Sequence, residues 1–69
     1  MKFVLIMMVC SQTLQVCTPP QEVDFYPNWF QCSSDGYLKA YELNQIIGKE
    51  RVEKELTIIN FQCKKINNI

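Results

Sequence analysis

Few residues in this chain could do catalytic chemistry. Its 69 residues include four cysteines and seven carboxylates but no histidine. Without histidine the chain lacks the usual general base, the usual activator of a serine or cysteine nucleophile, and imidazole for a zinc site. The cysteines, at positions 10, 17, 32 and 63, form no Cys-x-x-Cys pair, which argues against zinc and thioredoxin-like redox sites. We therefore predict that this protein is not an enzyme.

One stretch has oxygen-bearing residues at the spacing of a calcium loop. A twelve-residue calcium loop takes ligands at its first, third, fifth, seventh, ninth and twelfth positions, and glycine at its sixth position gives a sharp turn. Residues 31–42 follow this order except at the ninth position, and Gly36 is the sixth of them. The candidate metal ligands are Gln31, Ser33, Asp35, Tyr37 through its carbonyl, and Glu42.

With its flanks, over residues 30–47, this stretch resembles an EF-hand of the calmodulin type. Phe30 and Leu43 supply the apolar residues just outside the loop, and Leu38 supplies the branched aliphatic residue of its eighth position. The resemblance implies a helix-loop-helix at about 27–47. It also implies self-pairing of the loop, either with a second copy or with another chain.

The stretch departs from the family pattern in ways that lower its negative charge. Gln31 is neutral where the family has an aspartate, and Lys39 places a cation at the ninth position. Only Asp35 and Glu42 bring negative charge, and calcium affinity follows the number of charged ligands. We therefore predict weak calcium binding or none, and no other cofactor. A turn followed by a helix that Asp35 caps is the alternative interpretation.

The N-terminal segment is typical of a secretory signal peptide. Lys2 is followed by an apolar run over residues 3–10, which is too short to cross a bilayer as a helix. We predict a signal peptide over 1–17, with an uncertain cleavage site between about residues 14 and 20, and a small secreted mature domain over 18–69. A buried strand over the same apolar run is the alternative interpretation.

Cysteine parity predicts one disulfide in that mature domain. Cleavage near Thr18 removes Cys10 and Cys17 and leaves Cys32 with Cys63. A secreted domain with an odd number of cysteines would carry a reactive thiol, so the even pair is favoured, and whether Cys17 belongs to the mature chain stays open. A Cys32–Cys63 bridge would close a loop of about thirty residues and would contribute roughly 3–4 kcal/mol of stability.

The periodicity of the apolar residues predicts a mainly α fold. From Leu38 to Ile47 these residues have helical spacing, and Gly48 is a stop signal. Helical spacing resumes over 49–63, although alternation and β-branched residues make a strand over 56–63 the alternative. We predict a small helix-loop-helix or helical hairpin that the single disulfide stabilises.

Surface contact with a protein partner is the predicted mode of action. Seven basic side chains balance seven acidic ones, so no excess of positive charge attracts nucleic acid, and no segment is apolar for long enough to give a stable membrane span. Large rigid rings dominate binding hot spots, which makes the aromatic cluster of the chain its candidate contact surface. This cluster consists of Phe25, Tyr26, Trp29 and Phe30.

Three hypotheses about function follow. The leading one is a small secreted interaction protein, such as a toxin-like molecule, an effector or a peptide ligand, whose partner the sequence does not identify. The first alternative is a divergent EF-hand protein with weak or no calcium binding. The second alternative is a short or truncated reading frame without independent function.

Overall fold

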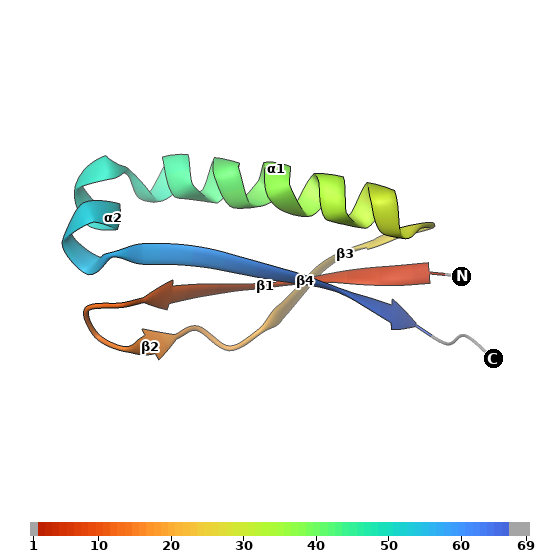
Figure 1. The fold of residues 1–69 in the computed structure, drawn as a ribbon, viewed down its shortest axis with the longest axis horizontal. Coiled ribbons are helices and arrows are strands. Elements are labelled where there is room, and N and C mark those ends of the chain that lie inside the picture. The colour runs from red at the N-terminus through yellow and green to blue at the C-terminus, as the bar shows by residue number, and fades with distance from the viewer. Residues whose placement is uncertain (1, 67–69) are drawn as a thin grey trace.

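The centre of the fold is its first strand, with which every other strand pairs (Figure 1). The computed structural model of the chain describes residues 2–66. Within them a four-stranded antiparallel sheet is combined with two helices. In chain order the elements are β1 (Lys2–Ser11), β2 (Val16–Cys17), β3 (Gln21–Tyr26), α1 (Trp29–Ile47), α2 (Lys49–Glu55) and β4 (Thr57–Ile66).

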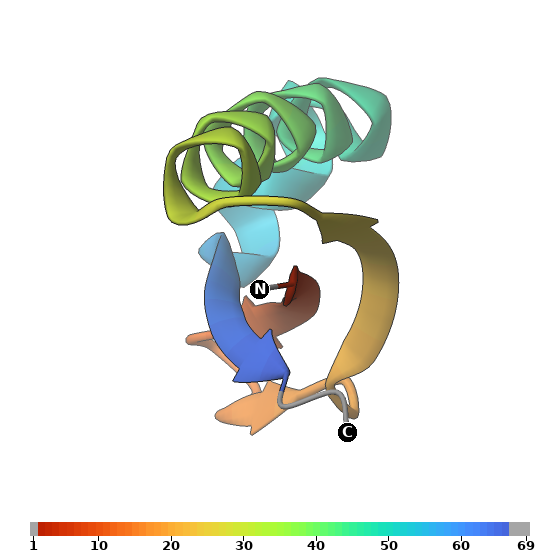
Figure 2. The same cartoon turned by 90° about the vertical axis from the view of Figure 1, so that its right-hand side faces the viewer.

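The prediction of a mainly α fold is therefore wrong, because the protein has a small α/β fold. β4 pairs with one edge of β1 over its whole length, from Lys2 opposite Ile66 to Ser11 opposite Thr57. The other edge of β1 is shared by β3, along residues 3–7, and by β2, at the end of β1. The sheet is strongly curved, and α1 lies across one of its faces (Figure 2).

The unbroken apolar run near the N-terminus is what a strand buried on both faces requires. Successive side chains of β1 point to opposite faces of the sheet, yet Val4 and Leu5 are only 3% and 0% exposed. Leu5 and Met7 pack with the two cysteines, Cys32 and Cys63, that join α1 to β4. In this structure the run is therefore the central strand, as the alternative interpretation of the segment expected.

Removal of this segment in a cell stays a prediction, and the fold gives it a clear consequence. A chain that began anywhere between residues 14 and 20 would lack β1, which is the strand that joins β3 to β4. Export with cleavage and the four-stranded sheet therefore exclude each other.

Helix α1 runs without a break through the segment expected to form a calcium loop. Asn28 caps the helix, because its side-chain oxygen accepts a hydrogen bond from the backbone N–H of Gln31 at 2.8 Å. The predicted stop at Gly48 is confirmed, and its φ of 96° suits glycine. The helix-loop-helix over 27–47 and the helical hairpin are wrong. The turn-like residues 33–36 stay helical because packing against the sheet outweighs their weak local preference.

The segment after α1 is first helix and then strand. α2 ends at Glu55, and the left-handed conformation of Leu56, with φ of 50° and ψ of 55°, turns the chain into β4. The helix predicted over 49–63 is therefore correct only as far as Glu55, and the strand alternative over 56–63 describes the rest. Its β-branched residues favour a strand, and pairing with β1 satisfies one edge of that strand.

Two disulfides cross-link the elements of the fold. The predicted Cys32–Cys63 bridge is confirmed, and it joins α1 to β4 with Cα atoms 6.2 Å apart. A second bridge, Cys10–Cys17, links β1 to β2 with Cα atoms 4.0 Å apart. The prediction of a single bridge is wrong because residues 2–17 belong to the fold, where their two cysteines lie opposite each other.

Candidate functional site

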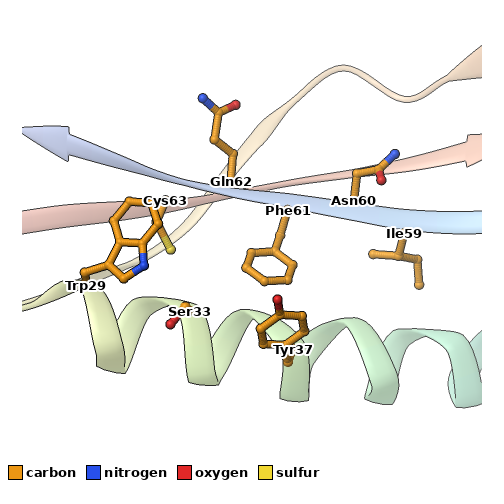
Figure 3. Close-up of a pocket in the computed structure, with 8 residues that line it drawn as sticks. All are labelled: Trp29, Ser33, Tyr37, Ile59, Asn60, Phe61, Gln62 and Cys63. Carbon is orange, nitrogen blue, oxygen red and sulfur yellow. The ribbon is translucent and has the colours of Figure 1, made fainter.

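A surface rich in aromatic rings lies where α1 meets β4. A solvent-open hollow of about 660 Å³ runs between these two elements. Figure 3 shows its side chains: Trp29 and Tyr37 come from α1, and Phe61 comes from β4 and points toward the helix. The hollow is therefore lined by aromatic rings from segments far apart in the sequence.

The ring of Phe61 fills the space between β4 and α1. Its ring meets that of Tyr37 edge-on, with ring centroids 4.9 Å apart. A Cβ atom added at Gly36 would lie 2.5 Å from two carbons of the Phe61 ring. Gly36 therefore permits a close approach of helix and strand, and it does not make the loop turn that the sequence suggested.

Three exposed rings continue this surface along α1. Phe30, Tyr37 and Tyr41 are spaced at i, i+7 and i+11, which places them on one side of a helix. They are 77%, 71% and 63% exposed, and together we call them the aromatic stripe. Sequence reasoning missed Tyr41 and the ring of Tyr37, although the spacing from Phe30 is a signal that could have found them.

The aromatic residues predicted as a contact surface do not form one surface. Trp29 lines the hollow and Phe30 belongs to the aromatic stripe. Phe25 lies on β3 beside a separate, smaller hollow. Tyr26 is half-buried and forms a hydrogen bond within the fold. Only two of the four residues therefore contribute to the surface between α1 and β4.

The five candidate calcium ligands lie along α1 and do not surround one point. A helix turns about 100° per residue, so Gln31, Asp35 and Glu42 share one side of it. Ser33 and Tyr37 lie on another side, where both line the hollow. Over residues 2–66, no three acidic or cysteine side chains come together as a metal site. Calcium binding stays a prediction, and it would require the ligand-bearing stretch to leave its helical form.

Comparison with known proteins neither supports nor opposes the EF-hand resemblance. No family model, curated protein or solved structure matches this chain. In the part of the chain that the structure describes, neither helix is long and apolar enough to cross a membrane. The surface between α1 and β4 must therefore be interpreted from its own chemistry.

A hydrogen bond ties the end of β3 to α1. The Tyr26 hydroxyl donates to the carboxylate of Asp35, and Nζ of Lys39 lies 3.5 Å from the same carboxylate. The hydrogen bond from Tyr26 lowers the pKa of Asp35, while burial opposes this and the charge of Lys39 adds to it. Burial, followed by the hydrogen bond to Asp35, raises the pKa of Tyr26 above its ordinary value.

Replacing Tyr26 by phenylalanine should reveal this bond through its dependence on pH. Because the pKa of Asp35 is lower in the folded chain than in the unfolded one, its stabilising effect is present above about pH 4 and is lost as the pH falls through the folded value. Since Asp35 is partly exposed, we expect Tyr26→Phe to cost about 1 kcal/mol at pH 7. Urea denaturation of Tyr26→Phe and of the parent measures the loss of unfolding free energy at pH 7 and at pH 2. We expect the loss to be smaller at pH 2.

The matched control is Tyr41→Phe, which removes the hydroxyl of a ring that is 63% exposed. It should leave the free energy of unfolding unchanged at either pH. An equal loss for Tyr26→Phe at both pH values would contradict the prediction, because the cause would then be packing and not the bond to an ionised carboxylate.

Proposed function

We propose that this chain is a small secreted binding protein that acts by protein–protein contact through the surface between α1 and β4, with no catalytic step. The observation that carries the proposal is the exposure of the aromatic stripe beside the hollow. Exposed rings gathered on one face are uncommon on a monomer and are typical of interaction sites.

The two disulfides support the proposal that the protein is secreted. Both disulfides lie in a chain of 69 residues, and disulfides persist in oxidising compartments such as the extracellular space. A domain of this size buries little apolar surface, which is why small secreted proteins depend on such bridges. The pattern is compatible with an extracellular location.

The shape of the surface favours a protein over a small molecule as the partner. Binding sites for small molecules enclose most of their ligand, and the hollow is open to solvent. The rings of Phe30, Tyr37 and Tyr41 extend this surface over three turns of helix. A partner that covers all of them must itself present a surface several residues across, as a folded protein does.

Photo-cross-linking tests the proposal. We would place p-benzoylphenylalanine at position 37, within the aromatic stripe, and in a second preparation at position 14. Leu14 lies between β1 and β2 and is 63% exposed, so it is a control of similar exposure outside the α1–β4 surface. Each labelled protein is added to a culture of the cells that produce it, and the culture is irradiated. Cross-linked products from the medium and from the cell surface are then identified by mass spectrometry.

We expect position 37 to give a discrete product that an excess of unlabelled protein removes. An excess of the Tyr37→Ala variant should compete much less well, because it lacks a central ring of the surface. The same products from positions 37 and 14, or products that no competitor removes, would contradict the proposal.

A further inference from the structure

We propose that the partner of the α1–β4 surface is a second copy of this chain, joined through the outer edge of β4 and the aromatic stripe. This inference rests on the proposed function, since it names the occupant of the same surface. It begins with the unpaired edge of β4, which pairs with β1 alone over the residues that the structure describes.

The hydrogen bonds of β1 show which groups of β4 are free. The backbone N–H and carbonyl of Val9 point away from β4. The N–H donates to the side-chain oxygen of Thr18 at 3.0 Å, and the carbonyl accepts from the N–H of Thr18 at 2.8 Å. Val9 is opposite Ile59, and the backbone groups of two paired residues in an antiparallel ladder point either toward each other or away from each other. The backbone groups of Ile59 therefore point away from β1. By alternation, the backbone groups on the open edge of β4 are those of Thr57, Ile59, Phe61, Cys63 and Lys65.

This edge lacks the features that normally prevent strands from pairing between molecules. Residues 57–63 contain no charge and no proline, and they form an uninterrupted part of a ten-residue strand. The edge strand on the other side, β3, is protected, because it carries Glu22 and Asp24 and shifts register opposite Leu5 and Ile6. In the part of the chain that the structure describes, the edge of β4 is therefore the longer and less protected edge for another strand.

Two-fold symmetry selects how two copies of β4 can pair. An antiparallel pair of identical strands is related by an axis perpendicular to the sheet, so both helices lie on the same face. Centred on Phe61, this pairing places Phe61 opposite Phe61 of the second copy and Asn60 opposite Gln62 of the second copy. Lys65 then lies opposite Thr57, so the lysines of the two copies stay at opposite ends of the interface.

The aromatic stripe gives the interface its area. Tyr37 meets Phe61 of β4, so the helix side that carries the stripe adjoins the edge where the second copy would pair. A buried aromatic side chain covers about 150–250 Å², so covering Trp29 and the three stripe residues hides about 500 Å² per copy and about 1,000 Å² in a dimer. Pairing of β4 adds to this and brings the total into the range of specific interfaces, about 1,200–2,000 Å².

Charge does not oppose the association. The chain has seven basic and seven acidic side chains, so two copies carry no net repulsion at neutral pH. The face of β4 turned away from α1 carries the amides of Asn60 and Gln62, both exposed. In the proposed pairing these amides face each other, twice by symmetry, and both positions can carry a charge. Asn60 also donates a weak hydrogen bond to Sγ of Cys10 at 3.6 Å, which its replacement removes.

Sedimentation velocity over a dilution series from millimolar to micromolar tests the proposal with charge variants of the full chain. In the double variant Asn60→Lys with Gln62→Lys, lysines at positions 60 and 62 of opposite copies face each other at two places. We expect the dimer dissociation constant to rise about tenfold or more. The matched control, Gln15→Lys with Gln21→Lys, adds the same charge at exposed positions in the turn between β1 and β2 and on β3, and it should leave the constant unchanged.

A mixing experiment identifies the interface independently of fold stability. The variant Asn60→Glu with Gln62→Glu should also dimerise weakly by itself, whereas an equimolar mixture with the lysine variant should form heterodimers at least as tightly as the parent, because each lysine then faces a glutamate. Near-ultraviolet circular dichroism of each variant confirms that the fold is retained.

Two outcomes would overturn the inference. The first is a parent chain that sediments as a monomer at every concentration, and the second is a dimer whose dissociation constant does not respond to charge at positions 60 and 62. In the cross-linking experiment, a product of twice the mass of the chain supports the inference. A competitor-sensitive product that contains another protein, together with a monomeric parent, would refute the second copy while the proposed function stood.

Discussion

A chain that starts at Thr18 will not fold, even with Cys32 and Cys63 oxidised to each other. It lacks β1, which supplies Val4, Leu5 and Met7 to the core, all at most 5% exposed. Burial of each such side chain stabilises a fold by about 1.5–3 kcal/mol. A chain of this size has a total stability of only about 3–10 kcal/mol, so loss of these three side chains together with the pairing of β1 removes most or all of it. We expect no cooperative unfolding transition for residues 18–69 in circular dichroism, whereas the full chain shows one.

A point substitution provides a milder version of the same test. Leu5→Ala in the fully buried centre of β1 should cost about 2–5 kcal/mol. Leu14→Ala removes the same atoms from a side chain that is 63% exposed, and it should change the free energy of unfolding by at most about 0.5 kcal/mol. Equal effects of the two substitutions would show that β1 is not the centre of the core.

These experiments also test the signal peptide prediction. If the 18–69 fragment folds cooperatively, the first seventeen residues are dispensable, and cleavage between residues 14 and 20 is compatible with a stable product. If it does not fold, a functional exported chain must keep residues 2–17. The mass of the chain recovered from the medium then distinguishes the two cases directly.

Loss of the Cys32–Cys63 bridge is the second large effect that we expect. Its two cysteines are 31 positions apart, and closing a loop of that length in the unfolded chain is worth about 4 kcal/mol. Cys32→Ala with Cys63→Ala should therefore bring the protein close to or below its folding threshold at 37 °C. Thermal unfolding followed by circular dichroism measures the loss.

The Cys10–Cys17 bridge is a matched control within the same chain. Its cysteines are only 7 positions apart, so the same argument gives about 2–3 kcal/mol. Cys10→Ala with Cys17→Ala should lower the midpoint of thermal unfolding less than the first double variant does. The reverse order would contradict the expected ranking of the two bridges.

Local signals in the sequence predicted local features correctly. Gly48 was recognised as the end of a helix because its effect depends on its own backbone conformation. Cys32 and Cys63 were paired by parity, and this pairing survived although the helical hairpin expected to bring them together does not exist. The sheet brings Cys63 to Cys32 instead, since β4 returns beneath α1.

Long-range pairing could not be predicted from such signals. The apolar run of β1 fits both a signal peptide and a strand buried on both faces, and only its partners decide between the two. The calcium-loop spacing around Gly36 failed in the same way. What selects glycine there is the ring of Phe61, twenty-five positions further along the chain, and no window of neighbouring residues contains that contact.

The pairing of β1 with β4 joins strands that are far apart in the sequence, with Lys2 opposite Ile66. During synthesis β1 is made before β4, so one edge of β1 stays unpaired until β4 is complete. Contacts between residues so distant in sequence make folding slow, and they leave a largely apolar strand available for aggregation meanwhile. The pairing of β1 with β2, closed by Cys10 and Cys17, and the pairing of β1 with β3 are the sheet contacts that can form before β4 is made.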